Sequence, residues 1–264
     1  MSLPNIYKSS AIVASTSNAS GISSISSQYA GLASLAGVSL PGSNETNKIS
    51  IGIETLKSFS FFKNFVIKHD LLIPLIASKG FDEATQTLII DDEFYNVKDK
   101  KWVSDVKYSI NGKPSLQYSY REFSKNLSID EDKKNGLVTI SFQHYSPLLS
   151  KNIVEMLIKD INDINRNEQI AQSKNSIEFL EMEIEGTQLT EVRSGLYSLI
   201  QKQVETMMLA NATPEFLFKT VSSPISPEIK SGPSRIIIVI LAFMGGFFLS
   251  CSYIIFRSHL LIKD

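Results

Sequence analysis

A run of three carboxylates, Asp91, Asp92 and Glu93 in the sequence DDEF, is the densest group of side chains that could do acid–base chemistry. Two carboxylates that flank a glycosidic bond act as acid and base, or as acid and nucleophile, in glycoside hydrolysis. Adjacent carboxylates in a polar stretch more often belong to a solvated loop, and we favour that interpretation. A glycan hydrolase that uses Asp91 or Asp92 is therefore the weaker hypothesis.

Other chemistry-bearing residues are scattered. His69, His144 and His259 show no spacing typical of metal ligands. Cys251 is the only cysteine, so neither an intramolecular disulfide nor a cysteine metal site can form. The phosphate-binding pattern GxxxxGK[ST] does not occur in the sequence. The sequence therefore predicts no enzyme and no cofactor.

Charge and length narrow the class of protein. The 264 residues include 26 Lys plus Arg and 27 Asp plus Glu, for a formal net charge of −1. Nucleic-acid-binding domains usually carry a clear basic excess, so no nucleic-acid partner is expected. The length allows one large domain or two small ones.

An uncharged apolar run covers residues 236–256, between Arg235 and Arg257. As a helix this run would be roughly 30 Å long, about the thickness of a bilayer core. We therefore expect a transmembrane helix here, followed by a short tail, 257–264; the flanking charges do not settle its orientation. Small residues four apart on one face could pack against another membrane helix, although such residues are also common in membrane helices generally. This face carries Ala242, Gly246 and Ser250.

Three prolines, Pro224, Pro227 and Pro233, precede the apolar run. Proline removes backbone donors and favours extended chain, so the segment is predicted to be a stiff connector between a folded domain and the bilayer. A PxxP ligand for an SH3-type domain is the less favoured alternative.

The segment 147–211 lacks proline after Pro147 and has apolar residues three and four apart, which predicts helix. One continuous helix of about 60 residues would be roughly 90 Å long. Two or three helices joined by turns near Gly186 and Gly195 are the alternative. Residues 162–175 are too polar for a core helix, so this part must project into solvent or lie against a polar surface. A candidate stripe for oligomer contacts comprises Ile177, Leu180, Ile184, Leu189, Val192 and Leu196.

Shorter patterns flank this segment. Strands are predicted over 7–16, twice within 115–147 around the turn sequence DEDKKNG, and over 215–223. Helices are predicted over 23–37 and 47–70, the second with Ile49, Ile53 and Leu56 on one face. The predicted fold class is α+β: a membrane-proximal α/β base, a long extended helix and one C-terminal transmembrane helix. The expected divisions are 1–146 (base), 147–211 (coiled-coil-like arm), 212–235 (returning strand and linker), 236–256 and 257–264.

Several segments together resemble the Wzz family of polysaccharide co-polymerases, the chain-length determinants of Gram-negative bacteria. The resemblance covers nearly the whole chain in the family's order, although no single motif is decisive. It implies that Pro224, Pro227 and Pro233 match the family's proline segment, and that Gly245 and Gly246 match small residues of its second membrane helix. The segments that carry it are LPNIYKSSAIVA, SSQYAGLASLAGVSL, IETLKSFSFFKNFV, DKKNGLVTISFQHYSPLLSKNIVEMLIKDIN and EVRSGLYSLIQKQVETMMLANATPEFLFKTVSSPISPE.

The resemblance implies a non-enzymatic scaffold in the bacterial inner membrane, with most of the chain in the periplasm. Copies would form a ring. The ring would regulate how many repeat units a Wzy-type polymerase adds to a polysaccharide such as O-antigen, in contact with the nascent glycan or the undecaprenyl-linked polymer. One copy cannot bury the polar part of the predicted long helix. Neighbouring copies in a ring would supply the surface against which it packs.

The family's first membrane helix is missing, and the N-terminus has no pattern of a signal peptide. We expect either a shortened cloned version, with Met1 and Ser2 added by cloning, or a gene start assigned too late, and favour the first. A tail-anchored cytosolic coiled-coil tether is the alternative function, because one C-terminal membrane helix and a long rod are all that such a protein needs.

Overall fold

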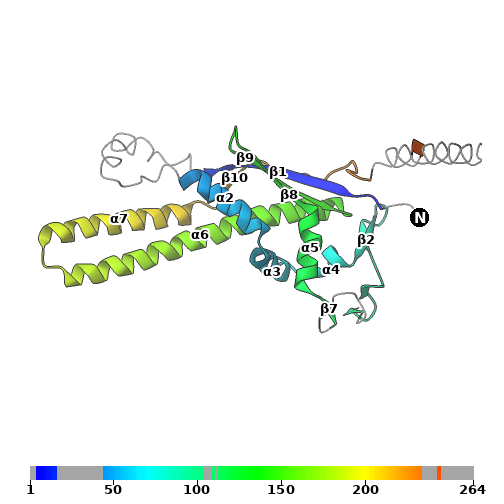
Figure 1. Ribbon diagram of the computed structural model, residues 1–264, viewed down its shortest axis with the longest axis horizontal. Coiled ribbons are helices and arrows are strands. Elements are labelled where there is room, and N and C mark those ends of the chain that lie inside the picture. The colour runs from blue at the N-terminus through cyan, green and yellow to red at the C-terminus, as the bar shows by residue number, and fades with distance from the viewer. Residues whose placement is uncertain (1–3, 17–43, 104–108, 111, 234–242, 245–264) are drawn as a thin grey trace, which may run out of the picture.

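The computed structural model describes residues 4–16, 44–103, 109–110, 112–233 and 243–244. The molecule is elongated, with a sheet and short helices near its middle and a helical hairpin that extends to one end (Figure 1). The first described residues and the chain leading to residue 233 lie toward the opposite end (Figure 1). The predicted mixture of helix and strand with a long helix is confirmed.

A four-stranded antiparallel sheet brings together strands from both ends of the chain. Its order is β10, β1, β9 and β8. The first and last strands of the chain are therefore neighbours, with Val13 opposite Thr220. The strands are β1 (Tyr7–Ser15), β8 (Leu127–Asp132), β9 (Leu137–His144) and β10 (Phe218–Ser222).

Alternation along the strands buries one face of this sheet. In β1 the side chains of residues 7, 9, 11 and 13 are buried, while those of 8 and 10 are exposed. The register places Ala11 opposite Ile140 and Val13 opposite Val138, all four fully buried. Burial of such side chains is the main stabilising term of the base.

The predicted helix 47–70 is two helices, α2 (Asn44–Lys57) and α3 (Phe59–Lys68). Ser58 separates them because its hydroxyl accepts a hydrogen bond from the Phe61 N–H at 3.1 Å, which caps the start of α3. The predicted face of Ile49, Ile53 and Leu56 is buried, which confirms that part of the prediction.

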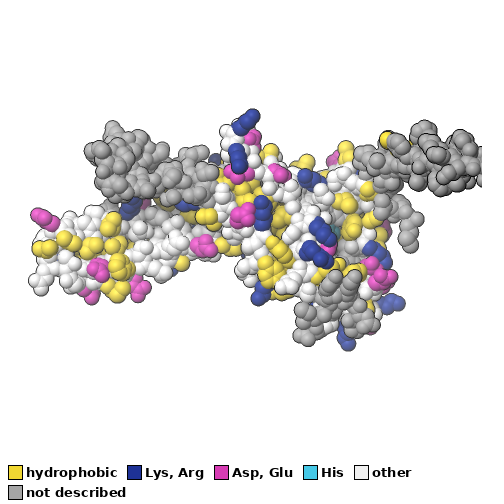
Figure 2. Space-filling model, viewed as in Figure 1, with side chains coloured by type: hydrophobic (Ala, Val, Ile, Leu, Met, Phe, Trp, Pro, Cys, Tyr) yellow, Lys and Arg dark blue, Asp and Glu magenta, His cyan; other side chains and the backbone are white. Residues whose placement is uncertain are grey.

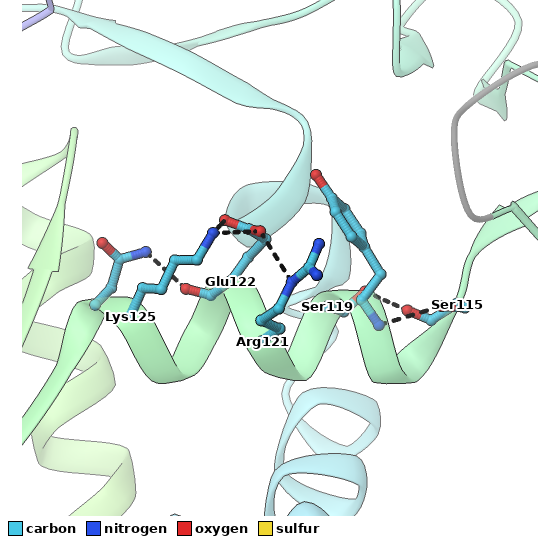
Figure 3. A network of polar contacts seen from close by, with 7 residues as sticks. Ser115, Ser119, Arg121, Glu122 and Lys125 are labelled. Carbon is cyan, nitrogen blue, oxygen red and sulfur yellow. Dashed lines mark hydrogen bonds and ion pairs between the residues drawn. The ribbon is translucent and has the colours of Figure 1, made fainter.

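The expectation of strand directly after residue 115 is wrong, because α5 (Leu116–Asn126) precedes β8. The Ser115 hydroxyl accepts a hydrogen bond from the Tyr118 N–H and starts the helix. Figure 3 shows the polar side of α5, where Glu122 lies between Lys125 and Arg121. The predicted β8–β9 hairpin is confirmed, with Gly136 at a φ of +65° in its turn.

Short elements that the sequence pattern did not predict lie among the described residues of 72–103, 109–110 and 112–114. They are α4 (Leu72–Ile76) and three two-stranded sheets: β2 (Ser78–Asp82) with β3 (Thr87–Ile90), β4 (Tyr95–Asn96) with β5 (Lys101–Trp102), and β6 (Ser109–Ile110) with β7 (Lys113–Pro114). Strands this short give little periodic signal.

The segment 147–211 is not one continuous helix. It forms α6 (Pro147–Gly186) and α7 (Thr190–Ala212), joined by residues 187–189 and packed as a hairpin. The alternative of helices joined by a turn near Gly186 is therefore confirmed, whereas Gly195 lies inside α7. The first half of α6 packs on the sheet and in the core through Ile153, Val154, Leu157 and Ile161, which are fully buried.

Asn162 of α6 fixes the start of β10. Its side-chain oxygen accepts hydrogen bonds from the N–H groups of Leu217 and Phe218, both at 2.8 Å, and its amide donates to the Phe218 carbonyl at 2.9 Å. Asn162 is only 3% exposed, so these backbone groups have little access to water. One buried side chain thus satisfies three polar groups where the chain returns from the hairpin to the sheet.

A second polar contact joins α6 to α3. The buried Asp160 carboxylate lies 2.6 Å from the Lys68 Nζ and 2.9 Å from the His69 Nε2. Lys68 is the last residue of α3 and His69 its C-cap. The Asp160 carboxylate is buried, while the Lys68 side chain is 55% exposed, so the contact joins α6 to the end of α3 at the edge of the core.

Asn162→Ala is expected to lower the free energy of unfolding by about 3 kcal/mol, because it leaves two N–H groups and one carbonyl buried without partners. Asn165→Ala is the matched control. The Asn165 amide donates only to the Ile161 carbonyl within α6, and its loss should cost less than about 1 kcal/mol. Urea unfolding followed by circular dichroism measures both. Equal losses in the two variants would contradict the proposed role of Asn162.

His144 joins α4 to the start of α6. Its ring Nε2 lies 3.0 Å from the Pro74 carbonyl, and its Nδ1 accepts the Ser146 N–H at 3.0 Å. These partners fit the neutral ring with its proton on Nε2. Burial lowers the pKa of His144 from an ordinary 6.5 to about 4, although the Pro74 carbonyl favours the protonated ring.

The protein is expected to lose stability as the pH falls from about 6.5 to about 4. In that window the unfolded chain binds a proton at residue 144 and the folded chain does not, so stability rises with pH. Between pH 7 and pH 5 the His144 contribution is about 2 kcal/mol. His144→Gln, which keeps one donor and one acceptor, should lose correspondingly less over this range in urea unfolding. Parallel pH profiles for wild type and variant would show that His144 does not cause the loss.

Candidate functional site

The most prominent functional feature of the described residues is the projecting part of the hairpin, residues 167–212, which we call the arm. Few of its side chains are buried. Only Ser173, Ile184 and Ala210 of the arm are buried. Of the candidate stripe, Ile177, Leu180 and Leu196 are half-buried, while Leu189 and Val192 are exposed. The stripe therefore contributes both to packing between α6 and α7 and to the outer surface.

The outside of the arm carries large apolar side chains that the arm itself does not cover. Leu189 is 68% exposed and Met208 is 65% exposed. Figure 2 shows hydrophobic side chains gathered near the free end of the hairpin on the face in view. Scattered exposed apolar residues are ordinary, but a concentration on one thin element is typical of an interaction surface. The full set is Phe179, Met182, Leu189, Val192, Tyr197, Leu199, Met208 and Leu209.

Ser173 places a hydroxyl group in the interior of the arm. Its hydroxyl is fully buried and has no hydrogen-bond partner among the described residues. An unsatisfied buried hydroxyl costs free energy. Packing between α6 and α7 at this level is therefore weaker than an apolar contact of the same size would give.

An open groove of about 530 Å³ lies at the root of the arm, between α6 and the chain on either side of β10. Its α6 wall presents alternating charges from Glu155, Lys159, Asp163 and Arg166. Arg166 and Asp163 pair at 2.9 Å. Asn162 lies in the same groove. Glu215 adds a third carboxylate, and Ile158, Pro214 and Pro224 add apolar surface, so the groove has a mixed lining that is continuous with the residues that hold the arm on the base.

The predicted proline segment is fixed along the beginning of β1. The Ile6 N–H donates to the Gly232 carbonyl at 2.9 Å, and the Ser231 N–H donates back to the Ile6 carbonyl at 2.8 Å. Pro224 is buried, while Pro227 and Pro233 are half-buried. The connector is therefore docked on the base.

The carboxylates and histidines that were considered for catalysis make only local structural contacts. Asp91 accepts the Glu93 N–H at 3.2 Å in a turn and lies 3.4 Å from the Lys79 Nζ, while Asp92 and Glu93 are exposed. This is the arrangement of a solvated loop. Among the described residues no group of three His, Cys, Asp or Glu side chains could hold a metal ion. His69 and His144 make the separate structural contacts given above, and His259 lies outside the described residues.

The predicted membrane helix 236–256 falls outside the described residues except for Phe243 and Met244, and so does the tail 257–264. The same holds for the predicted packing face of Ala242, Gly245, Gly246 and Ser250 and for the predicted helix 23–37. In the part of the chain that the structure describes, no helix combines the length and apolar character that a membrane span requires.

Sequence reasoning missed Asn162, the residue that holds the root of the arm. A signal was present, because Asn162 lies four residues after Ile158, on the side of the helix that Ile158 buries. A polar residue at helical spacing on an apolar face needs a buried partner. The partner itself, the backbone at Leu217 and Phe218, is 55 or more residues away in sequence and could not be identified.

Comparison with known sequences gives one partial match. No family model matches the chain. A putative tyrosine-protein kinase in the cps region of Klebsiella pneumoniae is 34% identical over 103 residues, which are 35% of this chain and 14% of the kinase. The chain thus spans a small part of the length of this curated relative.

Two of the solved structures that are similar to this chain are polysaccharide co-polymerases. A fragment of WzzB from Salmonella Typhimurium has a TM-score of 0.36 and 12% identity, over 86% of this chain and 100% of that one. A full-length bacterial polysaccharide co-polymerase has a TM-score of 0.30 and 13% identity, over 97% of this chain and 87% of that one. At these TM-scores and identities neither likeness carries an argument about the fold.

Proposed function

We propose that this chain is a polysaccharide co-polymerase of the Wzz type, a non-enzymatic scaffold that regulates the chain length of a bacterial surface polysaccharide. The observation that carries the proposal is the arm, a thin hairpin whose apolar side chains are exposed in a single copy. Such a surface acts by contact with other molecules. The family resemblance of the ordered sequence segments supplies the biological context.

The two ends of the structure suggest how the protein is oriented. The chain leading to the apolar run 236–256 lies at the end opposite the free end of the arm (Figure 1). If that run spans the inner membrane, the base lies next to the bilayer and the arm points away from it. The bulk of the chain would then occupy the periplasm.

Self-association through the arm would bury the exposed apolar side chains. Contacts between different faces of successive copies can close into a ring when the rotation between copies allows it. In this proposal the ring holds a Wzy-type polymerase and its nascent glycan or undecaprenyl-linked polymer near the membrane, and its geometry sets how many repeat units are added, for example to O-antigen.

The function is tested by expressing the full gene for this chain in a bacterium that lacks its own chain-length regulator. The expected result is a lipopolysaccharide ladder that changes from a steady decay to a cluster of preferred lengths. An unchanged ladder, with the protein detected in the membrane and with capsule and common antigen also unaffected, would refute the proposal.

The assembly is tested with the double variant Leu189→Ser and Val192→Ser on the outer surface of the arm. Each side chain that an interface buries contributes about 1.5–3 kcal/mol, so the pair should weaken self-association by about a hundredfold or more. Light scattering in mild detergent measures the assembly, and the polysaccharide ladder should broaden in parallel.

Ile67→Ser is the matched control, because Ile67 is 63% exposed but lies on α3 of the base. This control should leave both the assembly and the ladder unchanged. If the arm variant assembles as well as the wild type, the arm surface does not mediate self-association.

A further inference from the structure

Two isoleucines outside the arm are the most exposed large aliphatic side chains of the described residues. Ile225 is 73% exposed and Ile229 is 83% exposed. Both belong to the connector between β10 and the apolar run 236–256. Two apolar side chains this exposed on one short segment are available to contact a surface outside the base.

The exposure of these side chains is built into a fixed backbone. The Ser9 hydroxyl donates to the Ile225 carbonyl at 2.8 Å, next to the buried Pro224. After Ile229, the Ser231 N–H and hydroxyl both donate to the Ile6 carbonyl, at 2.8 and 3.0 Å. The contacts on both sides hold the segment against β1 while the two side chains point into solvent.

The position of the segment limits what can cover it. Ile229 lies seven residues before Ile236, where the apolar run begins, so the two are at most about 25 Å apart along an extended chain. The Lys230 Nζ lies 3.4 Å from the Asn5 side-chain oxygen and remains exposed, with Glu228 exposed on the other side of Ile229. Apolar tips beside a cationic side chain fit the boundary between lipid headgroups and acyl chains.

We propose that Ile225 and Ile229 dock on the lipid surface and seat the base on the bilayer. This inference rests on the proposed function, in that the run 236–256 must span a membrane. It assigns the connector a second role: besides leading to the membrane helix, it contacts lipid directly. With two lipid contacts and one membrane helix, the base would be restrained in tilt as well as in height.

The experiment uses the full chain with its single tryptophan removed by Trp102→Phe and one new tryptophan introduced per variant. The probes are Ile225→Trp and Ile229→Trp. Phe243→Trp, inside the apolar run, reports membrane insertion, and Leu189→Trp, at the arm, reports a similarly exposed site away from the bilayer. Each variant is reconstituted in phosphatidylcholine and phosphatidylglycerol vesicles whose acyl chains carry bromine near the headgroup, which quenches nearby tryptophan.

The expected result is strong quenching at 243, quenching at 225 and 229 of about half that strength, and none at 189. Quenching at 243 without quenching at 225 and 229 would overturn the lipid contact and leave membrane anchoring intact. A blue-shifted but unquenched probe at 225 or 229 would identify a protein partner instead, and also overturns it. Absence of quenching at 243 would refute the anchoring on which both proposals depend.

Discussion

Asn162 makes three hydrogen bonds to the backbone at the start of β10, and the positions of the other functional elements depend on them. Because the amide holds residues 217 and 218, the chain that returns from α7 joins the sheet beside β1. The connector that follows is then aligned with Ile6 and Ser9. Arm and connector thereby emerge toward opposite ends of the base. A buried polar contact of this kind specifies one arrangement, since any other leaves backbone groups unsatisfied.

Patterns that are local in sequence predicted the corresponding elements well. Alternation of side chains along β1 and β9, together with the turn sequence that ends at Gly136, predicted those strands, because burial of one sheet face requires a period of two. The long hairpin was predicted only as one of two alternatives. Three residues, 187–189, separate its helices, and apolar spacing on both sides gives little sign of a reversal. The helix α5 was read as strand because its aromatic residues have high β-propensity, which tertiary packing of Phe123 overrides.

The functional surfaces were less predictable than the fold. Periodicity indicates which residues lie on an apolar face, but a residue such as Leu189 satisfies the same pattern as Ile184 although one is exposed and the other buried. Likewise Ile225 and Ile229 stand among prolines and serines without any periodic signal. Which apolar side chains stay uncovered depends on how α7 and the connector are placed, and long-range contacts decide that placement.

The continuity of α6 from base to arm has a mechanical consequence. From Asn162 to Gly186 the helix extends about 36 Å, so a rotation of about 10° at its root moves the far end by about 6 Å. A small rotation of α6 where it leaves the base therefore becomes a large displacement at the free end of the arm. In the closed assembly proposed above, a small change in how neighbouring bases contact each other would displace the free ends of the arms much more than the bases themselves.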